Sequence, residues 1–152
     1  RNLMLGYYRD EQATRAAFEG GWLHTRDLGR FDASGNLYFH GRLGDMIKRA
    51  GENISTQEVE DALIGHPAVK DTAVFGVPDP VRDQAVKAVV VLKEGHSADA
   101  EDLREFCRAR LAYFKVPEFI DFLPELPRNA SGKVLKRELE ATAGKVSDRA
   151  TG

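Results

Sequence analysis

A central β-strand is predicted for residues 85–92, Ala85-Val86-Lys87-Ala88-Val89-Val90-Val91-Leu92. Its second half is apolar at every position, which is typical of a strand in the middle of a sheet. Further strands are predicted at residues 69–77 and 119–123, and residues 46–54 favour a strand and a turn. The sequence therefore indicates a sheet with residues 85–92 near its centre.

Helices are predicted between these strands. The sequence Ser55-Thr56-Gln57-Glu58 is a capping box, in which a hydroxyl and a carboxylate satisfy free amides at the start of a helix. A second helix is predicted from about Ala98 to Tyr113, and a short basic helix at residues 134–143. The order β-α-β-β-α-β predicts an α+β fold, a small sandwich with helices packed on one face of a mainly antiparallel sheet.

The N-terminal part has a different pattern. Residues 9–18 favour a helix, and Gly20-Gly21 stops it. Two short strands, at residues 22–31 and 37–40, surround a turn rich in Asp, Ser, Gly and Asn, which predicts a β-hairpin. The next five residues, Gly41-Arg42-Leu43-Gly44-Asp45, contain two glycines and two charges and are typical of a pivot between compact units.

The composition is that of a globular protein with a core. Of the 152 residues, 42% are hydrophobic and 30% are charged, and the net charge of -2 gives no overall field for nucleic acid or a membrane surface. No apolar run is long enough to span a bilayer, and the lone Cys107 cannot form an internal disulfide, so a cytoplasmic setting is expected. Residues 144–152 are predicted to be a disordered tail.

One loop places a cation where it could meet a phosphate or a carboxylate. The loop Pro127-Arg128-Asn129-Ala130-Ser131-Gly132-Lys133 sets a lysine beside a glycine, on flexible backbone. It is not a Walker loop, because Pro127 stands where that motif needs a glycine and Val134 follows the lysine. A solvated surface lysine is the alternative interpretation of Lys133.

Three other charged residues are candidates for binding. A carboxylate at the end of a strand, such as Asp27, can accept hydrogen bonds from both hydroxyls of a ribose, although it can also cap a turn. Arg42 is well placed for phosphate, whereas Lys48 has the pattern of an ordinary strand-edge lysine.

The histidines and the cysteine favour structural interpretations. The four histidines lack the spacing of a metal site, so no metal ligands are predicted. Cys107 shares a helix face with Leu103, Phe106 and Leu111, and is interpreted as a buried structural thiol rather than a nucleophile.

Four segments of the chain follow one another in a recognisable order. They are Gly6-Tyr7 with Ala13-Thr14, residues 21–29, residues 41–54 followed by Glu58 and Glu60, and residues 127–133. Together they resemble the C-terminal part of the adenylate-forming enzymes, the superfamily of acyl-CoA synthetases, nonribosomal peptide adenylation domains and beetle luciferases. The departures from the usual pattern of that superfamily are Gln12 in place of an acid, Arg26 in place of a glycine and Gly44 in place of a hinge Asp or Lys.

This resemblance implies roles in the transfer of the adenylyl group of ATP to a carboxylate. Asp27 would bind the ATP ribose, Arg42 would contact ribose or phosphate, and Lys133 would bridge the substrate carboxylate and the α-phosphate. An ammonium there offsets the repulsion between two anions and stabilises the developing charge. Mg²⁺ would neutralise the departing pyrophosphate.

The resemblance also implies a second reaction, the attack of the CoA thiol on the acyl-adenylate. Rotation about a hinge at Gly44 and Asp45 would replace Lys133 by the segment from Lys48 to Ile54. The CoA tunnel would then be formed by Lys48, Gly51, Glu52 and Asn53, and Lys115 would contact the CoA nucleotide.

Within the superfamily, residues 51–54, 81–88 and 114–117 are most similar to medium- or long-chain acyl-CoA ligases, especially the carnitine/crotonobetaine-CoA ligases. The expected reaction is carboxylate + ATP + CoA to acyl-CoA + AMP + pyrophosphate. Residues 1–41 would end an N-terminal AMP-binding domain, and residues 42–143 would form a lid that is inactive without that domain. Two alternatives are an adenylation domain that loads a carrier protein and a non-catalytic α+β interaction module.

Overall fold

The computed structural model describes residues 3–146, and its contacts divide the chain between Gly44 and Asp45 into two units. Within residues 3–146, the first unit contains one α-helix, a 3-10 helix and a β-hairpin, whereas the second contains the larger sheet and three α-helices. The elements of the first unit are α1 (Glu11–Ala17), η1 (Glu19–Gly21), β1 (Asp27–Phe31) and β2 (Leu37–Arg42), and η2 (Leu43–Asp45) spans the division. Those of the second are β3 (Met46–Arg49), β4 (Glu52–Ser55), α2 (Thr56–Ile64), β5 (Val69–Asp79), β6 (Asp83–Leu92), α3 (Ala100–Arg108), η3 (Tyr113–Lys115), β7 (Phe119–Phe122) and α4 (Lys136–Val146).

The first unit confirms the predicted helix and hairpin, but the first strand of the hairpin begins at Asp27, not at Trp22 as predicted. Helix α1 begins after Asp10, whose carboxylate accepts a hydrogen bond from Ala13 N at 2.9 Å. In the hairpin turn, Asp32 Oδ1 accepts from the backbone of Ser34 and of Asn36, both at 2.9 Å. Among the described residues of this unit only Gly41 is buried. The unit therefore lacks a core of its own.

The second unit is built on a five-stranded sheet. The strand order is β4-β3-β6-β5, and β7 pairs with the other edge of β6. Strands β5 and β6 form a long antiparallel pair, whereas β7 runs parallel to β6. The predicted mainly antiparallel sheet with a central strand at residues 85–92 is thus confirmed.

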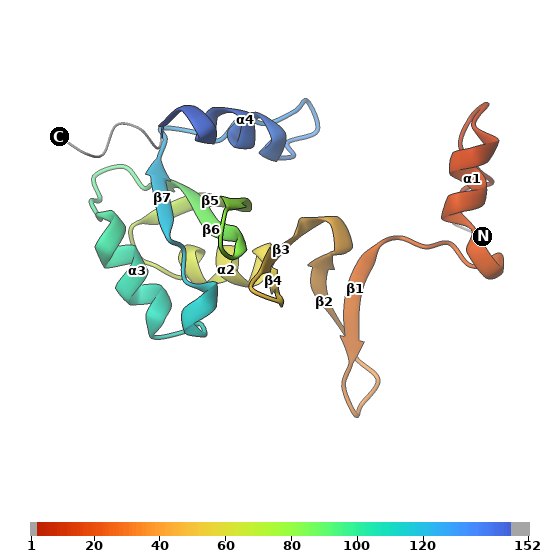
Figure 1. Ribbon diagram of the computed structural model, residues 1–152, viewed down its shortest axis with the longest axis horizontal. Coiled ribbons are helices and arrows are strands. Elements are labelled where there is room, and N and C mark those ends of the chain that lie inside the picture. The colour runs from red at the N-terminus through yellow and green to blue at the C-terminus, as the bar shows by residue number, and fades with distance from the viewer. Residues whose placement is uncertain (1–2, 147–152) are drawn as a thin grey trace. The chain divides into compact units, whose positions relative to one another are not determined.

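The helices of the second unit cover both faces of this sheet (Figure 1). Helices α2 and α3 pack on the face that carries Val86, Ala88 and Val90, and α4 packs through Leu139 on the face that carries Val89 and Val91. The prediction of helices on one face alone was wrong. Because β6 is apolar on both sides, each face needs a cover, and the C-terminal helix supplies the second one.

Two helix boundaries differ from the predictions. Helix α3 begins at a capping box between Asp99 and Asp102, and it ends near Ala109, before the predicted end at Tyr113. Its apolar periodicity continues past this point, but Cys107 O accepts hydrogen bonds from the next turn at 2.8 and 2.9 Å. Helix α4 extends to Val146, so residues 144–146, predicted as tail, are helical, and residues 147–152 lie outside the described range.

Candidate functional site

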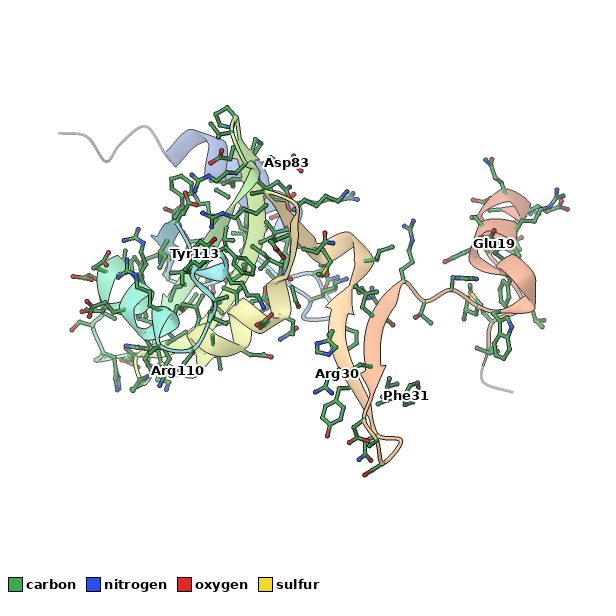
Figure 2. All side chains as sticks on the ribbon, turned by 60° about the horizontal axis from the view of Figure 1, so that its bottom comes forward. Glu19, Arg30, Phe31, Asp83, Arg110 and Tyr113 are labelled. Carbon is green, nitrogen blue, oxygen red and sulfur yellow. The ribbon has the colours of Figure 1, made fainter. Side chains whose placement is uncertain are left out.

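The hairpin of the first unit brings Asp27 and Arg42 together. They face each other in the register of β1 and β2, and Arg42 Nε donates to Asp27 Oδ1 at 2.9 Å. The Asp27 side chain is 36% exposed, so one carboxylate is anchored and still open to solvent. In the same hairpin Arg30 and Phe31 project to opposite sides (Figure 2). An anchored carboxylate beside a guanidinium is suited to bind a hydroxylated, anionic ligand.

Arg26, immediately before Asp27, explains one departure from the usual sequence. Its φ of 61° lies in the left-handed region, which glycine adopts without steric cost. The backbone is held there because Arg26 O accepts from Leu43 N at 2.8 Å. Arginine therefore adopts here a backbone conformation that glycine adopts without steric cost, and it does so at a cost of roughly 1 kcal/mol.

Lys133 lies on a loop with an ordered backbone. Asn129 Oδ1 accepts from Ser131 N at 3.1 Å, from Ser131 Oγ at 2.8 Å and from Lys133 N at 2.9 Å. Gly132, with φ of 81°, makes the turn, and its carbonyl accepts from Arg128 Nη1 at 2.6 Å. The sequence predicted a flexible backbone here. The structure instead holds the backbone by hydrogen bonds and leaves the Lys133 side chain exposed.

The end of this loop is tied to the sheet and to α2. Lys136, the first residue of α4, forms an ion pair with Glu60 at 2.8 Å and donates to Val74 O at 3.0 Å. Glu60 also accepts from Val74 N at 2.8 Å. These contacts fix the position at which the chain leaves the Lys133 loop and enters α4.

The predicted thiol-reaction segment forms the β3–β4 hairpin. Its turn residues, Ala50 and Gly51, have φ of 48° and 86°, the signs of a type I′ turn. Lys48 faces Asn53 across the ladder, and Glu52 faces Arg49. The side chains of Lys48, Glu52 and Asn53 are exposed, while the hairpin's Ile47 and Ile54 enter the core. The arrangement presents polar groups from a short, sharply turned arm.

Lys115, the predicted contact for the CoA nucleotide, is engaged within the chain. Its Nζ donates to both carboxylate oxygens of Glu58 at 2.7 and 2.8 Å. Glu58 was predicted to turn back in a capping box, and its amide does donate to Ser55 Oγ at 3.4 Å, but its carboxylate meets Lys115. A ligand phosphate at Lys115 would have to compete with this carboxylate.

Sequence reasoning missed a charged network next to the β3–β4 hairpin. Arg49 is buried and donates to Phe114 O at 2.9 Å and to Glu118. Glu118 also pairs with Arg82, which in turn pairs with Asp79 at 3.1 Å. Alternation along residues 46–49, with Ile47 and Arg49 two positions apart, could have shown that Arg49 points towards an interior, but not which partners it meets.

Cys107 lies in the core of the second unit, as predicted for a structural thiol. Burial raises the pKa of the Cys107 thiol from 9.0 to about 11, which suppresses the thiolate. Within residues 3–146, no three histidine, cysteine, aspartate or glutamate side chains gather as metal ligands. No helix in this range is long and apolar enough to cross a membrane.

Residues 58–133, half of the chain, match the AMP-binding enzyme C-terminal domain, and the match ends on Lys133. The chain belongs to this family. Over 141 residues, 92% of the chain, it is 47% identical to the crotonobetaine/carnitine–CoA ligase of Proteus mirabilis. The chain covers 27% of that ligase, so it spans about a quarter of the length of the curated relatives that it matches.

Solved structures support the same family assignment for the AMP-binding enzyme C-terminal domain. The o-succinylbenzoate CoA synthetase of Bacillus subtilis, in complex with its acyl-adenylate intermediate, is 41% identical, with a TM-score of 0.85 over 91% of this chain and 28% of that one. ATP-bound MatB of Rhodopseudomonas palustris is 34% identical, with a TM-score of 0.87 over 95% of this chain and 29% of that one. The resemblance and the α+β fold predicted from sequence are confirmed.

Proposed function

We propose that this chain is the C-terminal part of an ATP-dependent acyl-CoA ligase. The reaction is carboxylate + ATP + CoA to acyl-CoA + AMP + pyrophosphate. The observation that carries the proposal is the 47% identity, over 92% of the chain, to a crotonobetaine/carnitine–CoA ligase. The fold and the ordered lysine loop accord with it.

In the first half-reaction a carboxylate oxygen attacks the α-phosphorus of ATP and pyrophosphate leaves. Asp27 binds the ribose through its open oxygen, and Arg42 holds Asp27 and contacts ribose or phosphate. Lys133 reaches the substrate carboxylate and the α-phosphate from the loop that Asn129 orders. Its ammonium stabilises the charge that develops on the transferred group.

In the second half-reaction the CoA thiol attacks the acyl carbonyl and AMP leaves. Gly44 and Asp45 form the hinge, and they are the residues between which the contacts of the chain divide. Rotation there replaces Lys133 by the β3–β4 hairpin, with Lys48, Gly51, Glu52 and Asn53 along the path of the thiol arm. Lys115 contacts the CoA nucleotide only after it leaves Glu58.

Mg²⁺ bound to ATP would neutralise the charge of the departing pyrophosphate. The described residues offer no cluster of carboxylates and imidazoles for it, so we assign no residue of this chain as a metal ligand.

The main partner of the chain is the N-terminal AMP-binding domain of the same polypeptide. The first unit exposes large apolar side chains, among them Trp22 at 79% and Phe31 at 71%, and it has no buried side chain among its described residues. Such a surface requires a cover. In our proposal residues 1–41 complete that domain, residues 42–143 form the lid, and the chain alone is inactive because the acyl pocket lies elsewhere.

The proposed substrates are carboxylic acids of the kind that crotonobetaine/carnitine–CoA ligases use, with fatty acids as the second class. We also propose a cytoplasmic location. The one cysteine of the chain is a buried free thiol, which suits a reducing compartment, and the proposed reaction consumes ATP and CoA.

The proposal is tested with the full-length protein that contains this chain. Carboxylate-dependent exchange of pyrophosphate into ATP is measured with carnitine, crotonobetaine and a series of fatty acids, followed by acyl-CoA formation. We expect exchange with at least one acid and thioester only when CoA is added. Transfer to a carrier protein but not to CoA would favour an adenylation domain of the carrier-loading type. No exchange and no ATP-dependent change would favour a non-catalytic module.

A further inference from the structure

The β3–β4 hairpin is joined to the main sheet by very little backbone pairing. In the described chain β3 pairs with β6 at one position, Arg49 with Asp83, whereas β5 and β6 pair from Val69 to Asp79. Asp83 begins β6 (Figure 2), and Ala50 N donates to Arg82 O at 2.9 Å beside it. A two-stranded hairpin is marginally stable by itself, so side chains must hold this one in place.

Gln84 completes the sheet where the backbone does not. Its side-chain Oε1 accepts a hydrogen bond from Lys48 N at 2.7 Å, the position at which a neighbouring strand would offer a carbonyl. Gly76, on β5, makes room for it: a Cβ on Gly76 would lie 2.8 to 2.9 Å from the Gln84 amide group. The glycine therefore allows the Gln84 side chain to lie across the sheet and reach β3.

Arg49 holds the other side of the hairpin. Its guanidinium, 10% exposed, donates to Phe114 O at 2.9 Å and pairs with Glu118, so it joins β3 to the segment before β7. Glu118 accepts two further hydrogen bonds from Arg82 at 2.9 and 3.1 Å. Ion pairs taken out of water are weak evidence for stability, since packed apolar groups often stabilise such a junction as well. Our hypothesis is that this network enforces a single geometry.

We propose that Arg49 and Gln84 are positioning residues, which fix the direction of the β3–β4 hairpin for the attack of the acceptor thiol on the acyl-adenylate. This inference rests on the proposed function. Neither side chain touches the reacting atoms. Each acts through the backbone of Lys48 and Arg49, which carries the exposed Lys48, Glu52 and Asn53.

The first test measures amide hydrogen exchange in this chain by NMR. Gln84→Ala should speed exchange of the Lys48 amide at least tenfold, whereas Gln84→Glu, which keeps an acceptor oxygen, should restore most of the protection. Gly76→Ala should have the same effect as Gln84→Ala, because its methyl displaces the Gln84 amide. Unchanged exchange at Lys48 in Gln84→Ala would overturn the inference, whatever reaction the full-length protein performs.

The second test separates the half-reactions in the full-length protein. Arg49→Met and Gln84→Ala should lose at least five times more in acyl transfer from preformed acyl-adenylate than in pyrophosphate exchange, and Arg49→Lys should recover part of the loss. Lys87→Met is the matched control, since it breaks the ion pair between a buried lysine of the same sheet and Asp121 on β7, which is not a contact to the hairpin. This control should lower both half-reactions equally.

The inference is contradicted if Arg49→Met and Gln84→Ala each lose as much in pyrophosphate exchange as in acyl transfer, or if neither variant loses activity in either half-reaction. If the wild-type protein shows no pyrophosphate exchange, the proposed function is contradicted. The amide hydrogen-exchange test of Gln84 still applies in that case.

Discussion

Arg42 Nε donates to Asp27 Oδ1 at 2.9 Å, across a hairpin in which the two residues are direct register partners. They are fifteen positions apart in the sequence, and each was a candidate for nucleotide binding on separate grounds. Both side chains are partly exposed, so their mutual attraction adds little to stability. The pair is better suited to orient the Asp27 carboxylate towards a ligand.

Asp27→Ala should weaken ATP binding by the full-length protein by about 10- to 100-fold, the scale for losing hydrogen bonds to a charged group. Isothermal titration with ATP measures it. Asp32→Asn is the control: it lies in the same hairpin, and its amide oxygen can still accept from Ser34 N and Asn36 N. An affinity in Asp27→Ala equal to that of the control would remove Asp27 from the site.

Asn129→Ala should reduce pyrophosphate exchange by about tenfold, because the loop loses the acceptor of three hydrogen bonds, including that from Lys133 N. Ser131→Ala removes one of these bonds and keeps the two from the backbone, so it should stay within about threefold of wild type. Equal activities of the two variants would show that the order of the loop is irrelevant to the reaction.

The sequence predicted elements better than their packing. Alternation and capping placed the strands at residues 69–77 and 85–92 and the start of α2 near Ser55, because these signals are local. The helix at residues 134–143 was predicted, but its packing on the second face of the sheet was not, because what covers Val89 and Val91 depends on Leu139, far along the chain. Periodicity also extended α3 too far, since it cannot show where Cys107 O begins to accept turn hydrogen bonds.

For the candidate site, the residue types in the motifs identified Asp27, Arg42 and Lys133, and their roles stay predictions. Two features join segments that are far apart in the sequence: the ion pair of Lys115 with Glu58, and the charged network around Arg49. No local pattern contains such partners, so only the folded chain could reveal them.

The Cys107 thiol should make stability depend on alkaline pH. Its pKa is raised to about 11 in the folded chain, from 9.0, because burial disfavours the thiolate. Below pH 9 the Cys107 thiol is protonated in both the folded and the unfolded chain. Between pH 9 and 11 the thiol of the unfolded chain loses its proton while that of the folded chain keeps it. Stability should therefore fall over this window, by roughly 2–3 kcal/mol. Denaturant unfolding of wild type and Cys107→Ala as a function of pH measures the difference, and parallel curves would disprove the effect.

Lys87→Met should lower the free energy of unfolding by about 2–3 kcal/mol, because Asp121 loses its partner at 2.7 Å. The loss is below that of a fully buried pair since Asp121 is 31% exposed. Lys87→Met with Asp121→Leu should recover most of it. Denaturant unfolding of the chain provides both values, and a double variant less stable than the single one would contradict this account.

The most direct test of the ligase proposal compares the two half-reactions in full-length protein carrying Lys133→Ala. Lys70→Ala, which removes another exposed lysine of the same unit, is the control. We predict that Lys133→Ala lowers pyrophosphate exchange by roughly a hundredfold or more, the scale for removing one preorganised charge contact, and acyl transfer from preformed acyl-adenylate much less. Equal losses in the two half-reactions, or an exchange rate equal to that of Lys70→Ala, would contradict the assignment of Lys133 to adenylation.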